Sequence, residues 1–163
     1  MKKIMFFFAI SLFLSHNLIA QTKIESQNNF AKSYTYVNDF EKILTSDQIK
    51  TLNDFLKSSE TKSKNKIVIV TTPSIAPYTD LTDYSLDLDR YLISKLNIDT
   101  TVLIVISKQL RQIRVQGTDK THSKMTDQEI KDIVSAYVIP ELKKGDYYQG
   151  LLEGSRQLIK KLE

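Results

Sequence analysis

The sequence of 163 residues contains no cysteine, and only one of its two histidines, His122, lies beyond the first 20 residues. Without cysteine the chain has no disulfides, thiol nucleophiles, cysteine-ligated zinc or lipid-modified N-terminal cysteine. A catalytic triad or metal site based on histidine would have to depend on His122 alone. The four glycines form no glycine-rich phosphate loop. Chemistry carried by carboxylates and non-enzymatic binding remain as the candidates.

The first 20 residues have the pattern of a secretory signal peptide. Lys2 and Lys3 precede an almost purely apolar run over residues 4–14, and the small residue Ala20 precedes a plausible cleavage point. The run is too short for a membrane span, which needs about 20 apolar residues. We therefore expect export, cleavage near Ala20, a periplasmic or secreted mature protein, and no stable membrane anchor after cleavage.

The charge of the remaining chain is nearly balanced. The leader carries two lysines and no acidic residue, so its removal lowers the formal net charge from +4 to +2. Nucleic-acid binding calls for a basic face or stripe, so we expect no nucleic-acid partner. Residues 21–36 are polar and aperiodic, which predicts a flexible arm. Residues 37–163 have the length of a single domain.

Hydrophobic periodicity predicts four helices and three strands. The helical segments are residues 44–60, 79–96, 124–140 and 147–160. Two helices have an expected capping box at their start, formed by Thr45 with Gln48 and by Thr126 with Glu129. The strands are residues 66–73, 100–107 and 111–117.

The three strand segments differ in their pattern. The first two are apolar throughout, which is typical of strands buried on both faces. In the third, Ile113 and Val115 alternate with polar residues, which indicates an antiparallel strand near the edge of the sheet. The predicted fold is α/β, with a small central mixed β-sheet flanked by helices on both faces and the order α-β-α-β-β-α-α.

Acidic residues lie where the second and third predicted strands meet. Asp99 precedes one strand and Asp119 follows its hairpin partner, so the two residues should approach each other at one edge of the sheet. Asp127, in the first turn of the next helix, could join them, and Ca²⁺ or Mg²⁺ would need such oxygen ligands. Alternatively, Asp127 only complements the helix dipole and Asp99 only ends a turn.

The stretch KKGDYYQG, residues 143–150, resembles a ligand-binding loop but is explained locally as a corner between two helices. Lys143 and Lys144 suit the carbonyl end of a helix, and Gly145 suits the left-handed position after it. Asp146 can then cap the next helix. We therefore expect a structural role for this stretch.

Six segments of the chain, taken in order, resemble one known family. They are VNDFEKILTSDQIKTL, KIVIVTTP, VLIVIS, RQIRVQG, MTDQEI and VIPELKKGDYYQGLLEG. The most specific pattern comprises Pro140, Leu142, Lys143, Gly145, Asp146, Tyr147 and Gly150. Over about residues 37–160 the set is similar to the TPM domain family, which has thylakoid-lumen, photosystem II and acetylcholine-receptor-modulating members.

The resemblance implies an α/β sandwich outside the cytoplasm. It also implies either the acid phosphatase activity of the plant members, with divalent ions at acidic loops, or an assembly, repair or receptor-modulating role. The sequence departs from the family at residues 99–101, where a glycine is usual, and after Gly117, where a second glycine is usual. It also stops at Glu163, whereas many bacterial members continue into a membrane helix.

Two functions follow from the resemblance. We favour a non-enzymatic binding, assembly or maintenance factor of the cell envelope, with an envelope protein as its partner. The alternative is a phosphatase assisted by Ca²⁺ or Mg²⁺. Its metal ligands would be Asp39, Asp99, Asp119 and Asp127.

Overall fold

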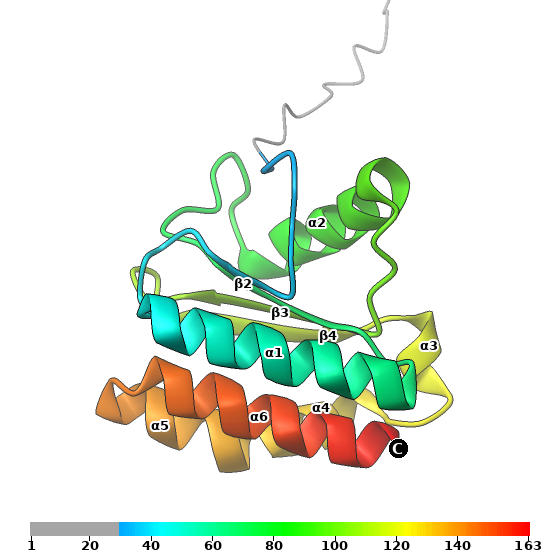
Figure 1. Ribbon diagram of the computed structural model, residues 1–163. Helices are drawn as coiled ribbons and strands as arrows, with labels where there is room; N and C mark the ends of the chain where they lie inside the picture. The colour runs from blue at the N-terminus through cyan, green and yellow to red at the C-terminus, as the bar shows by residue number, and fades with distance from the viewer. Residues whose placement is uncertain (1–29) are drawn as a thin grey trace, which may run out of the picture.

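The computed structural model describes residues 30–163 (Figure 1). The expected signal peptide, its cleavage point near Ala20 and residues 21–29 lie outside this part of the chain. Within residues 30–163 no helix is long and apolar enough to cross a membrane. The elements, in order, are β1 (Val37–Asp39), α1 (Ser46–Ser63), β2 (Ile67–Thr71), α2 (Leu81–Leu96), β3 (Val102–Ser107), β4 (Gln112–Gly117), α3 (Asp119–His122), α4 (Asp127–Ile133), the π-helix η1 (Val134–Val138), α5 (Ile139–Lys144) and α6 (Tyr147–Leu162).

A four-stranded mixed sheet forms the centre of the fold, with the strand order β1-β2-β3-β4. The first three strands are parallel, and β4 runs antiparallel to β3. The turn of the β3–β4 hairpin ends at Arg111, which takes a positive φ of 54°. This arrangement makes β1 and β4 the two edge strands and places the antiparallel strand where the alternating pattern predicted it.

Helices cover both faces of the sheet, as predicted (Figure 1). On one face, Leu88 and Leu92 of α2 pack on β2 and β3. On the other face, α1 and α6 pack on the same strands through the buried residues Leu52 and Leu158, among others. Successive residues of β2 and β3 point to opposite faces, so a strand covered by helices on both sides is apolar at every position.

The sequence analysis missed the first strand. β1 contains only three residues and pairs in parallel with β2, with Val37 opposite Ile69 and Asp39 opposite Thr71. Three residues are too few to show a period of two. The expected order therefore lacked a strand at its beginning.

Residues 30–36 belong to the packed structure, although they were expected to be part of a flexible arm. The Phe30 ring lies 5.4 Å from the Tyr84 ring and 5.3 Å from the Tyr91 ring, centroid to centroid. Tyr36 donates a 2.6 Å hydrogen bond from its hydroxyl to Glu60. Aromatic side chains at irregular spacing gave no periodic signal, so their burial became visible only in the tertiary structure.

The third predicted helix continues beyond the expected end near Pro140. α4, η1 and α5 follow one another directly to Lys144, and Pro140 lies in the first turn of α5. Proline lacks the N–H that an α-helix interior requires, and a π-turn just before it locally changes the hydrogen-bond pattern. The sequence rule that ends a helix at proline therefore did not apply here.

The KKGDYYQG stretch forms the predicted corner between α5 and α6. Gly145 has φ +83°, and the N–H of Asp146 donates to the carbonyl of Glu141 over 3.0 Å, which closes α5. The Asp146 carboxylate accepts from the N–H of Gln149 over 2.9 Å, which caps α6. The stretch is thus explained by helix termination.

Acid should selectively weaken the start of α4. Lys161 donates to Glu129 over 2.7 Å, and the N–H of Thr126 donates to the same carboxylate, so the pKa of Glu129 falls to about 2. The folded-state pKa lies below the unfolded value of about 4.3, so the stabilisation is present above that pH and is lost as the pH falls toward 2.

We expect Glu129→Gln to flatten the dependence of the melting temperature on pH between about pH 4 and 2. Thermal melts of both proteins across this range would measure the effect. Ser135→Ala, at an exposed position of η1, is the control and should leave the slope unchanged. Parallel curves for the wild type and Glu129→Gln would contradict the prediction.

Candidate functional site

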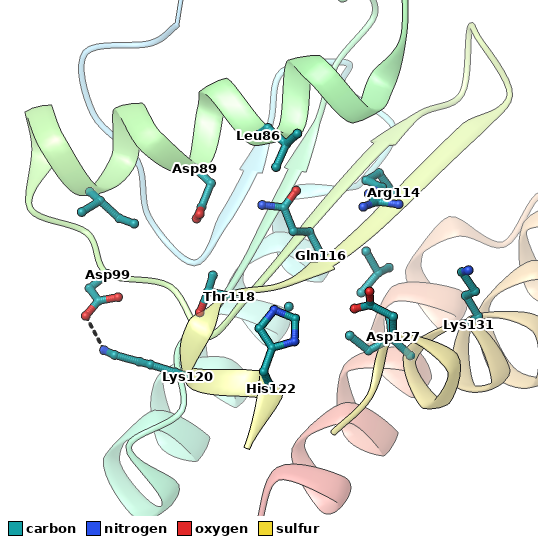
Figure 2. A pocket seen from close by; sticks show the side chains of 14 residues that line it. Leu86, Asp89, Asp99, Arg114, Gln116, Thr118, Lys120, His122, Asp127 and Lys131 are labelled. Atoms are coloured by element: carbon teal, nitrogen blue, oxygen red, sulfur yellow. Dashed lines mark ion pairs between the residues drawn. The ribbon is translucent and has the colours of Figure 1, made fainter. Parts of the chain in front are cut away.

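A groove of about 640 Å³ runs along β4, between α2 and the corner formed by α3 and α4 (Figure 2). We call it the β4 groove. Residues from α2, from the loop before β3, from β4 and from the α3–α4 corner line it. They are Leu86, Asp89, Ile93, Asp99, Arg114, Val115, Gln116, Gly117, Thr118, Lys120, His122, Asp127, Ile130 and Lys131.

Two polar side chains of β4 project into the groove. Gln116 lies opposite Leu103 and Arg114 opposite Val105 in the β3–β4 register, and both β3 residues belong to the core under α2. Directly opposite residues share a face, so Arg114 and Gln116 point to the α2 side (Figure 2). Gln116 is only 9% exposed.

Each of these side chains carries a buried polar atom without a hydrogen-bond partner. Within residues 30–163 the atoms in this state are Nε of Arg114, Oε1 of Gln116 and two serine hydroxyls on helices. An unpaired buried donor or acceptor costs about 1–3 kcal/mol. The β4 groove therefore holds an unpaired donor and an unpaired acceptor two residues apart on one strand.

The α2 side of the groove is partly apolar. The buried residues of α2 lie over β2 and β3, and the helix leaves the outer strand β4 only partly covered. Leu86 and Ile93, which are 36% and 45% exposed, face this uncovered strip. Between these two residues in the sequence, Asp89 accepts from the Thr100 hydroxyl over 2.7 Å, which ties the middle of α2 to the segment before β3.

The other side of the groove is the α3–α4 corner, which is bound closely to β3. Thr118 donates from its hydroxyl to the carbonyl of Thr100 over 2.8 Å, and the hydroxyl of the buried Thr121 donates to the carbonyl of Thr101. A Cβ on Gly117 would lie 2.9 Å from Thr121. Gly117 is therefore required for the close approach of α3.

The structure confirms that the segments before β3 and after β4 meet. Asp99 forms an ion pair with Lys120, directly beside Asp119, whose side chain is not among those described. Asp127 lines the same groove (Figure 2). The hairpin thus brings Asp99, Asp127 and the backbone of Asp119 to one end of the sheet.

Asp39 lies at the opposite end of the sheet. It is the last residue of β1 and is paired with Thr71 at the end of β2, whereas Asp99 precedes the start of β3. Its carboxylate accepts from the N–H groups of Ile43 and Leu44 and from the hydroxyl of Thr71. The expected group of four aspartates is therefore divided between the two ends, and Asp39 closes a turn.

The remaining aspartates do not form a cation site within the described side chains. No group of three or more histidine, aspartate or glutamate side chains in residues 30–163 is arranged to hold a metal ion. Asp99 is already paired with an ammonium group. We therefore derive no step through a bound cation.

The charges that line the β4 groove balance. Arg114, Lys120 and Lys131 face Asp89, Asp99 and Asp127, so the formal sum is zero when His122 is counted as neutral. A site for a strongly anionic ligand would carry an excess of cations. The lining therefore suits a polar ligand without a large net charge.

Sequence analysis missed Arg114 and Gln116 as candidate residues. Their alternation with Ile113 and Val115 indicated a strand with one polar, solvent-exposed face. That pattern is equally typical of a solvent-exposed edge. Only the position of α2 and α3 showed that this face lines a groove.

The sequence from Val37 to the end of α6 matches a known family. A family model described as the TPM domain matches residues 37–161. The chain belongs to the TPM domain family. The match covers all four strands and ends within α6, so the β4 groove is part of the TPM domain itself.

Solved TPM-like structures share this fold. The N-terminal domain of a protein from P. gingivalis is 25% identical, with 81% of this chain and 84% of that chain covered and a TM-score of 0.69. The BA42 protein of Bizionia argentinensis is 20% identical, with 76% and 83% covered and a TM-score of 0.64. The N-terminal domain of a Corynebacterium glutamicum protein is 13% identical, with 82% and 90% covered and a TM-score of 0.59.

The comparison with curated proteins gives no match. The structural similarities therefore establish the TPM fold and leave the function to be argued from the β4 groove.

Proposed function

We propose that this TPM-domain protein is an exported, non-enzymatic binding factor of the cell envelope and that the β4 groove holds its partner. The observation that carries the proposal is the buried, unpaired donor of Arg114 beside the buried, unpaired acceptor of Gln116, on two side chains that line the groove and can turn toward a ligand. A ligand that supplies an acceptor and a donor would satisfy both atoms and recover their desolvation cost.

Export is supported by the sequence of the first 20 residues, which has the features of a signal peptide. A binding role is supported by the lining of the groove. Its aspartates are not grouped, Asp99 is paired with Lys120, and the Thr100 hydroxyl that donates to Asp89 is fully buried, out of reach of a substrate.

A phosphatase is the second candidate, because the groove brings Arg114, Lys131 and His122 near Asp127. Arginine and lysine can hold phosphoryl oxygens, and an aspartate can take part in proton transfer. The groove carries equal numbers of cationic and anionic residues. This balance disfavours a phosphate ester, which carries about two negative charges.

Capture of a partner from an envelope extract tests the proposed function. We expect the wild type to retain a specific protein that Gln116→Leu, which removes the unpaired acceptor, fails to retain. Gln112→Leu changes the same strand outside the groove and should retain the partner. Equal retention by all three baits would overturn the assignment of function to the β4 groove.

An assay with a chromogenic phosphate ester separates the two candidates. We expect no hydrolysis above background by the wild type with millimolar Ca²⁺, with millimolar Mg²⁺ or with EDTA. Melting curves under the same conditions provide a second readout, because a cation that binds the folded state raises the melting temperature by linkage. Hydrolysis and a cation-dependent rise that Asp127→Asn abolishes would establish the phosphatase instead.

A further inference from the structure

We propose that the β4 groove takes an extended, net-uncharged segment of a partner protein, which pairs with β4 as a fifth strand. The proposal rests on the proposed binding function and names the class of its ligand. It is carried by the free edge of β4, the unpaired atoms of Arg114 and Gln116, and the charge balance of the groove.

β4 is an edge strand with outward backbone groups. The N–H of Thr118 donates to the carbonyl of Thr101, so the residues that face β3 are Thr118 and, at alternate positions before it, Gln116 and Arg114. The backbone groups of Val115 and Gly117 then point away from the sheet. Both residues line the groove.

An added strand would meet these groups at the usual spacing of about 4.8 Å. Main-chain hydrogen bonds provide affinity in this mode of recognition, and pockets for alternate side chains provide specificity. On the α2 side, the ligand would pass Arg114 and Gln116 near the exposed Leu86 (Figure 2). The exposed Ile93 lines the same groove.

Amide groups fit the unpaired pair of atoms. Backbone groups of an added strand point toward β4 or away from it, so the partners of these atoms come from a carboxamide side chain on the α2 face of that strand. Its oxygen accepts from Nε of Arg114, and its NH2 group donates to Oε1 of Gln116. The apolar surface of Leu86 and Ile93 accommodates an aliphatic side chain next to them. A neutral segment agrees with three cationic and three anionic residues in the lining.

The test uses a phage-displayed library of random peptides about ten residues long, the upper length of common strands. Peptides selected on the purified protein are synthesised, and their affinities are measured by calorimetry. We expect affinities about tenfold weaker for Gln116→Leu and for Arg114→Met, because each variant loses one hydrogen bond to the ligand. Gln112→Leu is the matched control and should stay within twofold.

Fold stability separates lost binding from lost structure. Gln116→Leu replaces a buried unpaired acceptor with an apolar group of similar size, so its melting temperature should equal or exceed that of the wild type. Weaker peptide binding by a variant of equal stability supports the proposal. Affinities unchanged in both groove variants would overturn it.

A scan of N-methylated peptides tests the strand pairing itself. Only every second N–H of an added strand faces β4, so methylation should abolish binding at alternate positions and spare the others. Equal tolerance at all positions would overturn the proposal, and so would the selection of no binding peptide. In those cases groove-dependent capture of a partner would still support the proposed function.

Sedimentation of the free protein tests a competing occupant, a second copy of the chain. We expect a monomer, because the proposed occupant is a foreign segment. A dimer that Val115→Pro dissociates would overturn the proposal, since proline removes an outward N–H that a second β4 would need.

Discussion

Replacing Gly154 by valine is expected to lower the free energy of unfolding by about 3 kcal/mol, at the upper end for overpacking of a filled core. Gly154 is buried on α6 and faces η1, where a Cβ would lie 2.5 Å from Cγ2 of Val138. Val138 is itself buried, and its branched side chain has little rotamer freedom in a helix. The clash can therefore be relieved only if α6 moves away from η1.

Urea denaturation of the wild type and the variant measures this loss. A loss of 3 kcal/mol is large relative to the 5–15 kcal/mol typical of a domain, so the variant should be partly unfolded at physiological temperature. Gly145→Ala is the comparison, because no atom lies within 4 Å of a Cβ there. That variant should lose only about 1 kcal/mol, from the positive φ.

A double-mutant cycle identifies the cause. Val138→Ala removes the atom that a side chain at residue 154 would meet. We expect Gly154→Ala to be less destabilising in the Val138→Ala background than in the wild type, because neighbouring substitutions are not additive. Additive losses would show that the contact with Val138 does not limit the approach of α6.

Asp39→Ala should lower the free energy of unfolding by about 2–4 kcal/mol, because hydrogen bonds to a charged group contribute about 1.5–3 kcal/mol each and their losses overlap. The Asp39 carboxylate accepts from Ile43 over 3.1 Å, from Leu44 over 2.9 Å and from the Thr71 hydroxyl over 2.5 Å. Thr71 is fully buried, so its hydroxyl would lose its acceptor away from water.

The same variant separates a structural role from a role in metal binding. If Asp39 closes the turn before α1, the loss of stability should be equal in EDTA and in millimolar Ca²⁺. Asp99→Ala is the matched control at the other end of the sheet. It removes an exposed ion pair with Lys120 and should cost less than about 1 kcal/mol. A loss at Asp39 seen only with Ca²⁺ would contradict the structural role.

The Asp39 result bears on the interpretation of acidic residues in this TPM domain. The sequence analysis grouped Asp39 with Asp99, Asp119 and Asp127 as ligands of one cation, but the parallel strands place Asp39 at the opposite end of the sheet. Neighbouring parallel strands run in the same direction. A residue that follows one strand and a residue that precedes the next strand therefore lie at opposite ends of the sheet.

Local patterns in the sequence determined most of the elements. The capping boxes at Thr45 and Thr126 form as predicted, because each needs only two residues three positions apart. The continuous apolar runs of β2 and β3 predicted strands covered on both faces, and the corner at Gly145 followed from the preference of glycine for positive φ.

Only the tertiary structure decided the rest. β1 is too short to have a period of its own and exists because β2 offers it a partner, and the helix passes Pro140 because a π-turn precedes it. Arg114 and Gln116 alternate with apolar residues as any edge strand does. They became a candidate site because α2 and α3, distant in sequence, form a groove around them. Periodicity predicts which face of a helix or strand is polar. The elements that pack beside that face depend on long-range packing.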